Sequence, residues 1–167
     1  AIPNVIDNDE WGNLESGALC SYDNNDANIA EYGLIYNWYA VDDSRNIAPE
    51  GWHVPTDEEW KELEIFIGMS LTVIDSLDFR GTNEGGKVKE TGITHWLTPN
   101  TGATNETKFT ALPSGIRFNS SFIKIGETGR WWSSESPWTR RLSFESAEIQ
   151  RSYRGFTEGF SIRCVKD

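Results

Sequence analysis

The sequence predicts an α+β fold, with helices in the first half of the chain and short strands in the second half. One amphipathic segment, residues 56–68, carries both a helix-start and a helix-stop signal. From Phe109 onward, short apolar stretches alternate with turns that contain glycine or serine, which is typical of strands and hairpins. Because helical and extended patterns do not alternate along the chain, we expect an antiparallel sheet rather than repeated strand–helix–strand units.

The segment "TDEEWKELEIFIG" has the strongest local signals in the chain. Thr56 and Glu59 have the spacing of a capping box, and the acids at 57–59 suit the positive end of the helix dipole. Gly68 predicts the end of this helix. We expect a single apolar face that is formed by Trp60, Leu63, Phe66 and Ile67.

The most apolar stretch of the chain is "YGLIYNWYAV", residues 32–41. Its first half predicts a short buried strand. Asn37 then predicts the cap of a short helix that begins at Trp38, because an asparagine side chain can accept a hydrogen bond from the first turn.

Length and charge limit the classes of protein to which the chain can belong. With 167 residues it has the size of one domain, and we expect a single domain over residues 1–167. Its formal net charge of −11 repels phosphate backbones and anionic lipids, so we expect neither nucleic acid nor membranes as partners. No stretch approaches the roughly 20 apolar residues of a membrane-spanning helix. The chain begins at Ala1 rather than Met, and we expect that a leader or lipid anchor was removed.

Five motifs occur in a fixed order: "YGLIYNWYAV", "NIAPEGWHVPTDEEWKELE", "FTALPSGIR", "WWSSE" and "GFSIRCVKD". Together they closely resemble the Fibrobacter succinogenes major paralogous domain family over nearly the whole chain. That family is similar to the C-type lectin-like fold of the formylglycine-generating enzymes. The resemblance implies a loop-rich domain in which two helices flank a small, irregular antiparallel sheet and the terminal strands lie together. It also implies a secreted or cell-surface protein of Bacteroidetes or Fibrobacteres, often a lipoprotein.

The two cysteines, Cys20 and Cys164, could form one disulfide or remain as unpaired buried thiols. The resemblance makes the disulfide plausible, since it places the terminal strands side by side. Many members of the family carry a cysteine where this chain has Ala48, so Cys164 pairs with Cys20 or stays free. The formylglycine-generating enzymes use two cysteines near the chain end, where this chain has only Cys164, so we do not expect their activity.

Two histidines are the remaining candidates for acid–base chemistry. His53 precedes the acids at 57–59, but those acids are explained by the helix start, so we expect a packed or hydrogen-bonded structural histidine. His95 has no acid or cysteine near it in the sequence, and we expect a loop residue. Because GxSxG, P-loop, GxGxxG and HExxH motifs are absent, we do not expect an enzyme.

Oxygen-bearing side chains cluster in "SYDNNDAN", residues 21–28, which predicts turns. The resemblance adds calcium as a cofactor to consider, because C-type lectin-like domains often bind it. The segment lacks the glycine and terminal glutamate of an EF-hand loop, so we favour a solvated turn. The candidate calcium ligands are Asp23, Asn25 and Asp26.

Arginine and aromatic residues gather at 130–141 and 150–156 of this acidic chain. Aromatic rings stack on sugar faces, while Arg and Glu orient hydroxyl or carboxylate groups. The "WWSSE" segment looks like family scaffold, so we expect Trp131 or Trp132 in the core. The expected ligand-binding residues are Trp138, Arg140, Arg151, Tyr153, Arg154 and Glu135.

We therefore expect a non-catalytic binding module whose partner is a polysaccharide or a glycoprotein glycan. The local positive charge favours an acidic glycan. An alternative is a protein–protein interaction domain or a structural accessory domain of a surface assembly. A third hypothesis is an enzyme similar to the formylglycine-generating group, which needs a cysteine pair or a tight histidine–carboxylate cluster in the folded chain.

Overall fold

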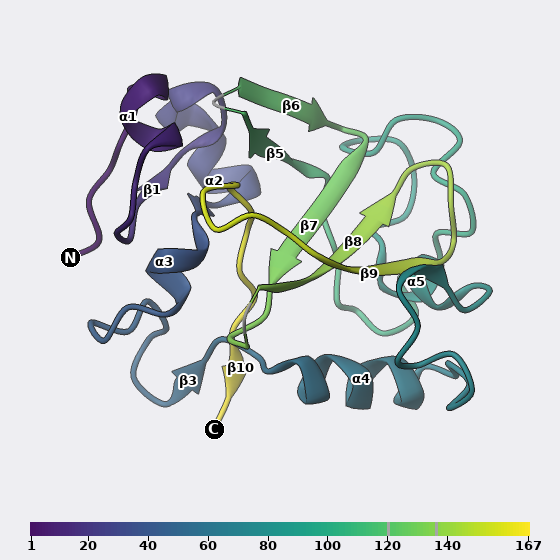
Figure 1. Cartoon of the computed structure of the whole chain (residues 1–167). Coiled ribbons are helices and arrows are strands. Elements are labelled where there is room, and N and C mark those ends of the chain that lie inside the picture. Colours follow the sequence, from purple (N-terminus) through teal and green to yellow (C-terminus); the bar gives the residue numbers. More distant parts are fainter. Residues whose placement is uncertain (120, 136) are drawn as a thin grey trace.

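The computed structural model describes residues 1–119, 121–135 and 137–167, and its architecture is mixed α/β (Figure 1). Within these ranges the α-helices are α1 (Asn8–Gly12), α2 (Ile29–Tyr32), α3 (Trp38–Val41), α4 (Asp57–Phe66) and α5 (Glu84–Val88). Two 3-10 turns, η1 (Tyr22–Asn24) and η2 (Asp26–Asn28), precede α2. The chain thus has one helix of 10 residues and several single-turn helices, not the expected pair of flanking helices.

The strands form small antiparallel sheets, as the sequence predicts. They are β1 (Leu19–Cys20), β2 (Ile35–Tyr36), β3 (Trp52–His53), β4 (Asp78–Arg80), β5 (Ser114–Phe118), β6 (Ser121–Ile125), β7 (Thr128–Trp132), β8 (Trp138–Ser143), β9 (Ile149–Tyr153) and β10 (Val165–Lys166). We call the sheet with the order β4–β9–β8–β7 the main sheet. The pairs β5–β6, β1–β2 and β3–β10 form separate two-stranded sheets, and α4 runs along the lower side of the main sheet in Figure 1.

Helix α4 begins as the sequence predicts. The Thr56 hydroxyl accepts a hydrogen bond from the Glu59 amide at 3.1 Å, and the Glu59 carboxylate accepts one from the Thr56 amide at 2.8 Å. The predicted apolar face is wrong at Phe66, whose residue surface is 86% exposed. Glu64 is buried instead, because the residues that follow Trp60 at one-turn intervals are those that face the sheet. One face of α4 is therefore charged and buried, which apolar periodicity alone does not reveal.

The apolar interior contains both tryptophans of "WWSSE". Trp131 belongs to the cluster between α4 and the main sheet. Trp132 belongs to a second cluster, and its ring lies 4.5 Å from that of Phe160. Its indole N–H donates to the Tyr36 carbonyl at 2.8 Å, so its one polar atom is paired. The expectation of a core position is confirmed for both residues.

Asn37 caps α3 and also ties this helix to the preceding chain. Its side-chain oxygen accepts hydrogen bonds from the amides of Ala40 at 3.0 Å and Ala18 at 2.9 Å. Its amide nitrogen donates to the Ser16 carbonyl at 2.9 Å. The predicted helix cap is confirmed, and both the oxygen and the nitrogen of the buried amide form hydrogen bonds.

The terminal strands do not pair with each other. Strand β10 pairs with β3, and β1 pairs with β2. Cys20 is consequently packed in a cluster beside β2, whereas Cys164 lies just before β10, and both are free thiols. The Cys20–Cys164 disulfide is therefore not formed. Among the described residues, no helix is long and apolar enough to cross a membrane.

Candidate binding site

Two of the predicted ligand-binding arginines are internal. Arg140 and Arg151 are buried and donate to the Asp57 carboxylate at 2.7 and 2.6 Å. Glu64 accepts from Arg140 at 2.7 Å and from Arg80 at 2.6 Å. These contacts join α4 to strands β4, β8 and β9, so Arg140 and Arg151 hold the helix on the sheet and are not available to a ligand.

The charge of Asp57 is fixed by this network. Burial alone would raise the pKa of its carboxyl group, but the guanidinium groups of Arg151 and Arg140 outweigh burial and hold the pKa at about 2. Asp57 is therefore ionised at neutral pH. From the sequence, Asp57 was expected only to interact with the helix dipole. Its partners Arg140 and Arg151 were not predicted, because they lie 83 and 94 residues away along the chain.

The other predicted ligand residues are not buried, but two of them have partners within the chain. The ring of Trp138 lies between Tyr153 and Arg151. The ring centroids of Trp138 and Tyr153 are 3.6 Å apart, and the Arg151 guanidinium carbon is 3.4 Å from the centroid of the Trp138 ring. The Glu135 carboxylate accepts from the Asp57 amide at 3.1 Å and thereby caps α4. Glu135 and Tyr153 are exposed, and Trp138 and Arg154 are half-buried, so all four keep some accessible surface.

A cleft of about 320 Å³ lies between α4 and the β3–β10 pair. Its lining residues are Trp52, Pro55, Glu59, Trp60, Leu63, Phe109, Arg163, Cys164, Val165 and Lys166. Trp52 is 42% exposed, and the Arg163 guanidinium lies 4.5 Å from the centroid of Phe109. The cleft thus combines an accessible indole and apolar walls with three charged side chains.

The pairing of β3 with β10 builds this cleft. It places Lys166 opposite Trp52 and Val165 opposite His53, and Figure 1 shows the two strands beside the start of α4. The cleft was not predicted from the sequence, in which Trp52 was not among the expected ligand-binding residues. An aromatic residue in a two-residue strand gives no signal of the partner strand, which lies near the other end of the chain.

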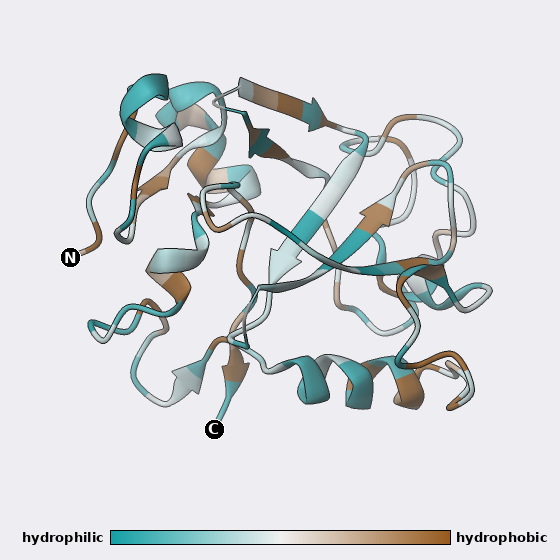
Figure 2. Cartoon of the chain, viewed as in Figure 1, coloured by the Kyte–Doolittle hydropathy of each residue, from teal (hydrophilic) through white to brown (hydrophobic). Residues whose placement is uncertain are grey.

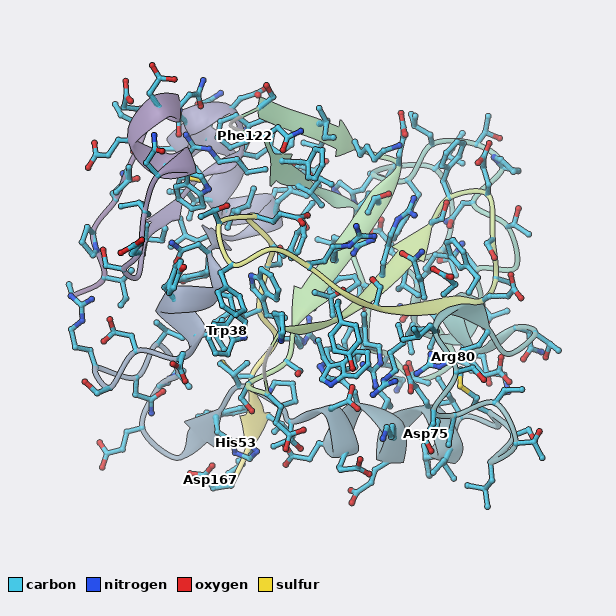
Figure 3. The ribbon with its side chains drawn as sticks, in the orientation of Figure 1. Trp38, His53, Asp75, Arg80, Phe122 and Asp167 are labelled. Carbon is cyan, nitrogen blue, oxygen red and sulfur yellow. The ribbon has the colours of Figure 1, made fainter. Side chains whose placement is uncertain are left out.

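His53 supports one wall of the cleft. Its Nε2 lies 2.7 Å from the Glu59 carboxylate and its Nδ1 lies 2.7 Å from that of Asp167, which is next to it in Figure 3. Each ring nitrogen faces a carboxylate, which only accepts, so both nitrogens carry a proton and the ring is a cation. Hydrogen bonds to Asp167 and Glu59 also raise the pKa of the imidazole. The expectation of a hydrogen-bonded structural histidine is confirmed.

His95 lies in a loop, as expected, but it has the same kind of environment as His53, with two carboxylate partners that the sequence did not indicate. Its Nδ1 lies 2.7 Å from the Glu90 carboxylate, and its Nε2 contacts the carboxylate of Glu31 on α2. The Glu90 and Glu31 hydrogen bonds raise the pKa of His95 despite its partial burial. The bridge links α2 to the loop after α5, and its partner on α2 is 64 residues away in the chain.

The two histidine bridges predict a pH dependence of stability. In the folded chain the pKa of each histidine ring lies above the usual 6.5. The bridges therefore stabilise the fold fully below pH 6.5, and this contribution is lost as pH rises through the folded pKa. A variant with both His53→Gln and His95→Gln should lose more unfolding free energy, relative to the parent chain, at pH 6 than at pH 9. Urea denaturation at the two pH values measures this difference. An equal loss at both values would contradict the assignment of charged imidazoles.

The predicted calcium ligands serve the local turns instead. The Asn25 side chain accepts from the Ala27 amide at 3.1 Å, and the Asp26 carboxylate accepts from the Ser21 hydroxyl at 3.3 Å. Asp23 is exposed. In the described part of the chain, no group of three or more His, Cys, Asp or Glu side chains is arranged to hold a metal ion. The turns predicted for this segment are confirmed by η1 and η2.

The fold and the cleft define a mixed α/β domain of small antiparallel sheets with an aromatic-lined surface site. The chain matches the family described as the Fibrobacter succinogenes major domain over residues 3–166, and it belongs to that family. No curated protein and no solved structure matches it.

Proposed function

We propose that this chain is a non-catalytic carbohydrate-binding module with a C-type lectin-like fold, and that the cleft between α4 and β3–β10 is its sugar site. The observation that carries the proposal is the accessible Trp52 indole at a cleft of about 320 Å³ with charged groups around apolar walls. Indole rings stack on the apolar faces of sugars, and carboxylate, guanidinium and ammonium groups bind hydroxyls. The combination suits a sugar better than a wholly apolar ligand.

The polar groups of the cleft are arranged to bind rather than to react. Glu59 is fixed by His53 and Thr56, and its hydrogen bonds to them lower the pKa of its carboxyl group against the opposing effect of burial. The neighbouring Cys164 is a poor nucleophile, because burial raises the pKa of its thiol. A charged imidazole with both nitrogens bonded is a poor general base. These features favour binding over catalysis.

The location that fits this function is the outside of the cell. We place the module in a secreted or cell-surface protein, where polysaccharide and glycoprotein glycans are accessible to it. The formal charge of −11 agrees with a partner other than nucleic acid or an anionic membrane.

Replacing Trp52 by alanine should weaken saturable binding to a soluble polysaccharide about tenfold or more, since a stacking contact contributes about 1.5 kcal/mol. Affinity electrophoresis against a panel of neutral and acidic polysaccharides identifies a ligand, and isothermal titration calorimetry measures the change. Tyr153→Ala is the matched control, because Tyr153 is an exposed aromatic residue outside the cleft. A Trp52→Ala variant that binds as well as the parent chain would exclude the cleft, and a lack of binding to every polysaccharide would exclude the function.

A second candidate function is protein–protein interaction, which is supported by a group of exposed apolar side chains. Exposed apolar side chains lie at the end of α4 and in the loop that follows, namely Ile65, Phe66, Leu71 and Leu77. Figure 2 shows this last turn and loop in brown. Loss of partner capture in a Phe66→Ser variant, with polysaccharide binding absent, would favour this function over the first.

A further inference from the structure

Three arginines lie together on the face of the main sheet that points away from α4. Arg130 on β7 is directly opposite Arg141 on β8. Arg130 also donates to the hydroxyl of Ser152 on β9, and Arg154 follows Ser152 by two residues, the spacing at which side chains share a face. Arg140 and Arg151, whose side chains alternate with these, point to the other face and meet the acids of α4.

None of these three arginines has a carboxylate partner within 4.0 Å among residues 1–119, 121–135 and 137–167. Arg130 is buried, and its donors reach only neutral oxygens, those of Thr139, Ser152 and Gln150. Among the described residues, Arg141 donates only to the Thr128 hydroxyl, at 3.3 Å. This contrasts with Arg80, Arg140 and Arg151 on the opposite face, each of which contacts a carboxylate of α4.

Two nitrogen atoms of this cluster are buried without any acceptor in the described chain. They are the Nε atoms of Arg130 and Arg154. A buried guanidinium nitrogen without an acceptor is costly, because it has lost its hydrogen bond to water and gained none in return. A ligand that carries negative oxygens would offset the positive charge of these two guanidinium groups.

The cluster is unfavourable without a ligand. Like charges directly opposite each other on neighbouring strands destabilise a sheet. Burial lowers the pKa of Arg130, and the charges on Arg154 and Arg141 lower it further. Acidic groups influence the cluster from beyond ion-pair distance, namely Glu127, Glu145 and Glu158. They offset part of its charge but do not pair with it.

We propose that Arg130, Arg141 and Arg154 form a binding site for one oxyanion, a carboxylate or sulfate group. Arg141 and Arg154 are half-buried and would contact the anion, while Arg130 lies beneath them and contributes charge. Guanidinium groups bind such oxyanions through paired, charge-assisted hydrogen bonds. The anion is either a free inorganic ion or a substituent of an acidic polysaccharide. This site lies on the opposite face of the sheet from the Trp52 cleft and does not depend on the function proposed for that cleft.

The test compares sodium sulfate with sodium chloride at equal ionic strength, using calorimetric titration and thermal unfolding of the whole chain. Sulfate should bind saturably and raise the unfolding temperature more than chloride does. Arg154→Gln should weaken sulfate binding about tenfold or more, the effect of losing a hydrogen bond to a charged group. Arg141→Gln gives a second, independent variant. Arg45→Gln, which removes an exposed arginine that pairs with Asp43, is the charge-matched control and should bind sulfate as the parent chain does.

Dextran sulfate and neutral dextran distinguish the two sources of the anion. If dextran sulfate binds more tightly than free sulfate and neutral dextran does not bind, the ligand is a polymer substituent. If dextran sulfate binds no more tightly than sulfate per anionic group, the ligand is the free ion. Equal stabilisation by sulfate and chloride would overturn the proposal, and so would sulfate binding that survives in both Arg154→Gln and Arg141→Gln.

Discussion

Replacing Glu64 by glutamine is expected to lower the free energy of unfolding by about 3–5 kcal/mol, the usual cost of removing one partner from a buried ion pair. Glu64 is 0% exposed and lies between Arg80 and Arg140. Glutamine keeps the size of the side chain but is not a carboxylate, so Arg80 is left buried without its ion-pair partner. Urea denaturation, followed by tryptophan fluorescence, measures the change.

The matched control is Glu62→Gln, two residues earlier on the same helix. Glu62 is exposed and forms no ion pair with any described residue, so this change should alter stability by less than about 0.5 kcal/mol. A loss below about 1 kcal/mol in Glu64→Gln would show that the network does not hold α4 on the sheet. The measured loss reports the cost of an unpaired buried charge and not the net contribution of the ion pair.

The start of α4 could be predicted because its determinants are local. Thr56 and Glu59 satisfy each other's backbone amides within four residues, and this pattern is visible in any sequence. The buried face could not be predicted, because it depends on arginines from strands that are distant in the chain. Glutamate is a residue type that is usually exposed to solvent. The burial of Glu64 is favourable only because Arg80 and Arg140 form ion pairs with it.

The alternation of the strands explains why the arginine-rich segment was only partly understood from sequence. The side chains of neighbouring residues in a strand point to opposite faces of the sheet, so Arg140 and Arg141 cannot belong to the same site. Which face meets the acids depends on where α4 packs, and no local pattern gives that information. The Trp52 cleft was missed for a similar reason, since its other wall comes from β10 near the end of the chain.

Replacing Lys89 by methionine should lower the free energy of unfolding by roughly 3 kcal/mol. Lys89 is 0% exposed, and its ammonium group donates to the carbonyl oxygens of Thr101, Ser143 and Ser146, each at 2.9 Å. Methionine fills the same space but removes the donor from all three carbonyls, and an unpaired carbonyl costs about 1–3 kcal/mol. The Ser143 carbonyl keeps a second, longer hydrogen bond from the Ser146 amide at 3.4 Å. Relief from burying a charge offsets part of this loss, since burial lowers the pKa of Lys89 from 10.5 to about 8, which corresponds to roughly 3 kcal/mol.

Lys87→Met is the control for this change, because Lys87 is partly exposed and donates to a single carbonyl, that of Ile67. Water can replace the lost hydrogen bond there, so a loss of about 1 kcal/mol or less is expected. A loss in Lys89→Met no larger than that in the control would contradict the structural role of the buried ammonium group.

The pH dependence of the Lys89→Met effect provides a second, independent measurement. Since the folded pKa of Lys89 is about 8 and the usual value is 10.5, the unfolded chain binds more protons between these values. The contribution of Lys89 to stability therefore increases as pH rises through this window, because deprotonation removes the cost of burying the charge. Methionine does not titrate, so the deficit of the variant should widen from pH 8 to pH 10. A constant deficit would contradict this, because it would mean that the folded and unfolded pKa values of Lys89 are equal, and a shrinking deficit would mean that folding raises its pKa.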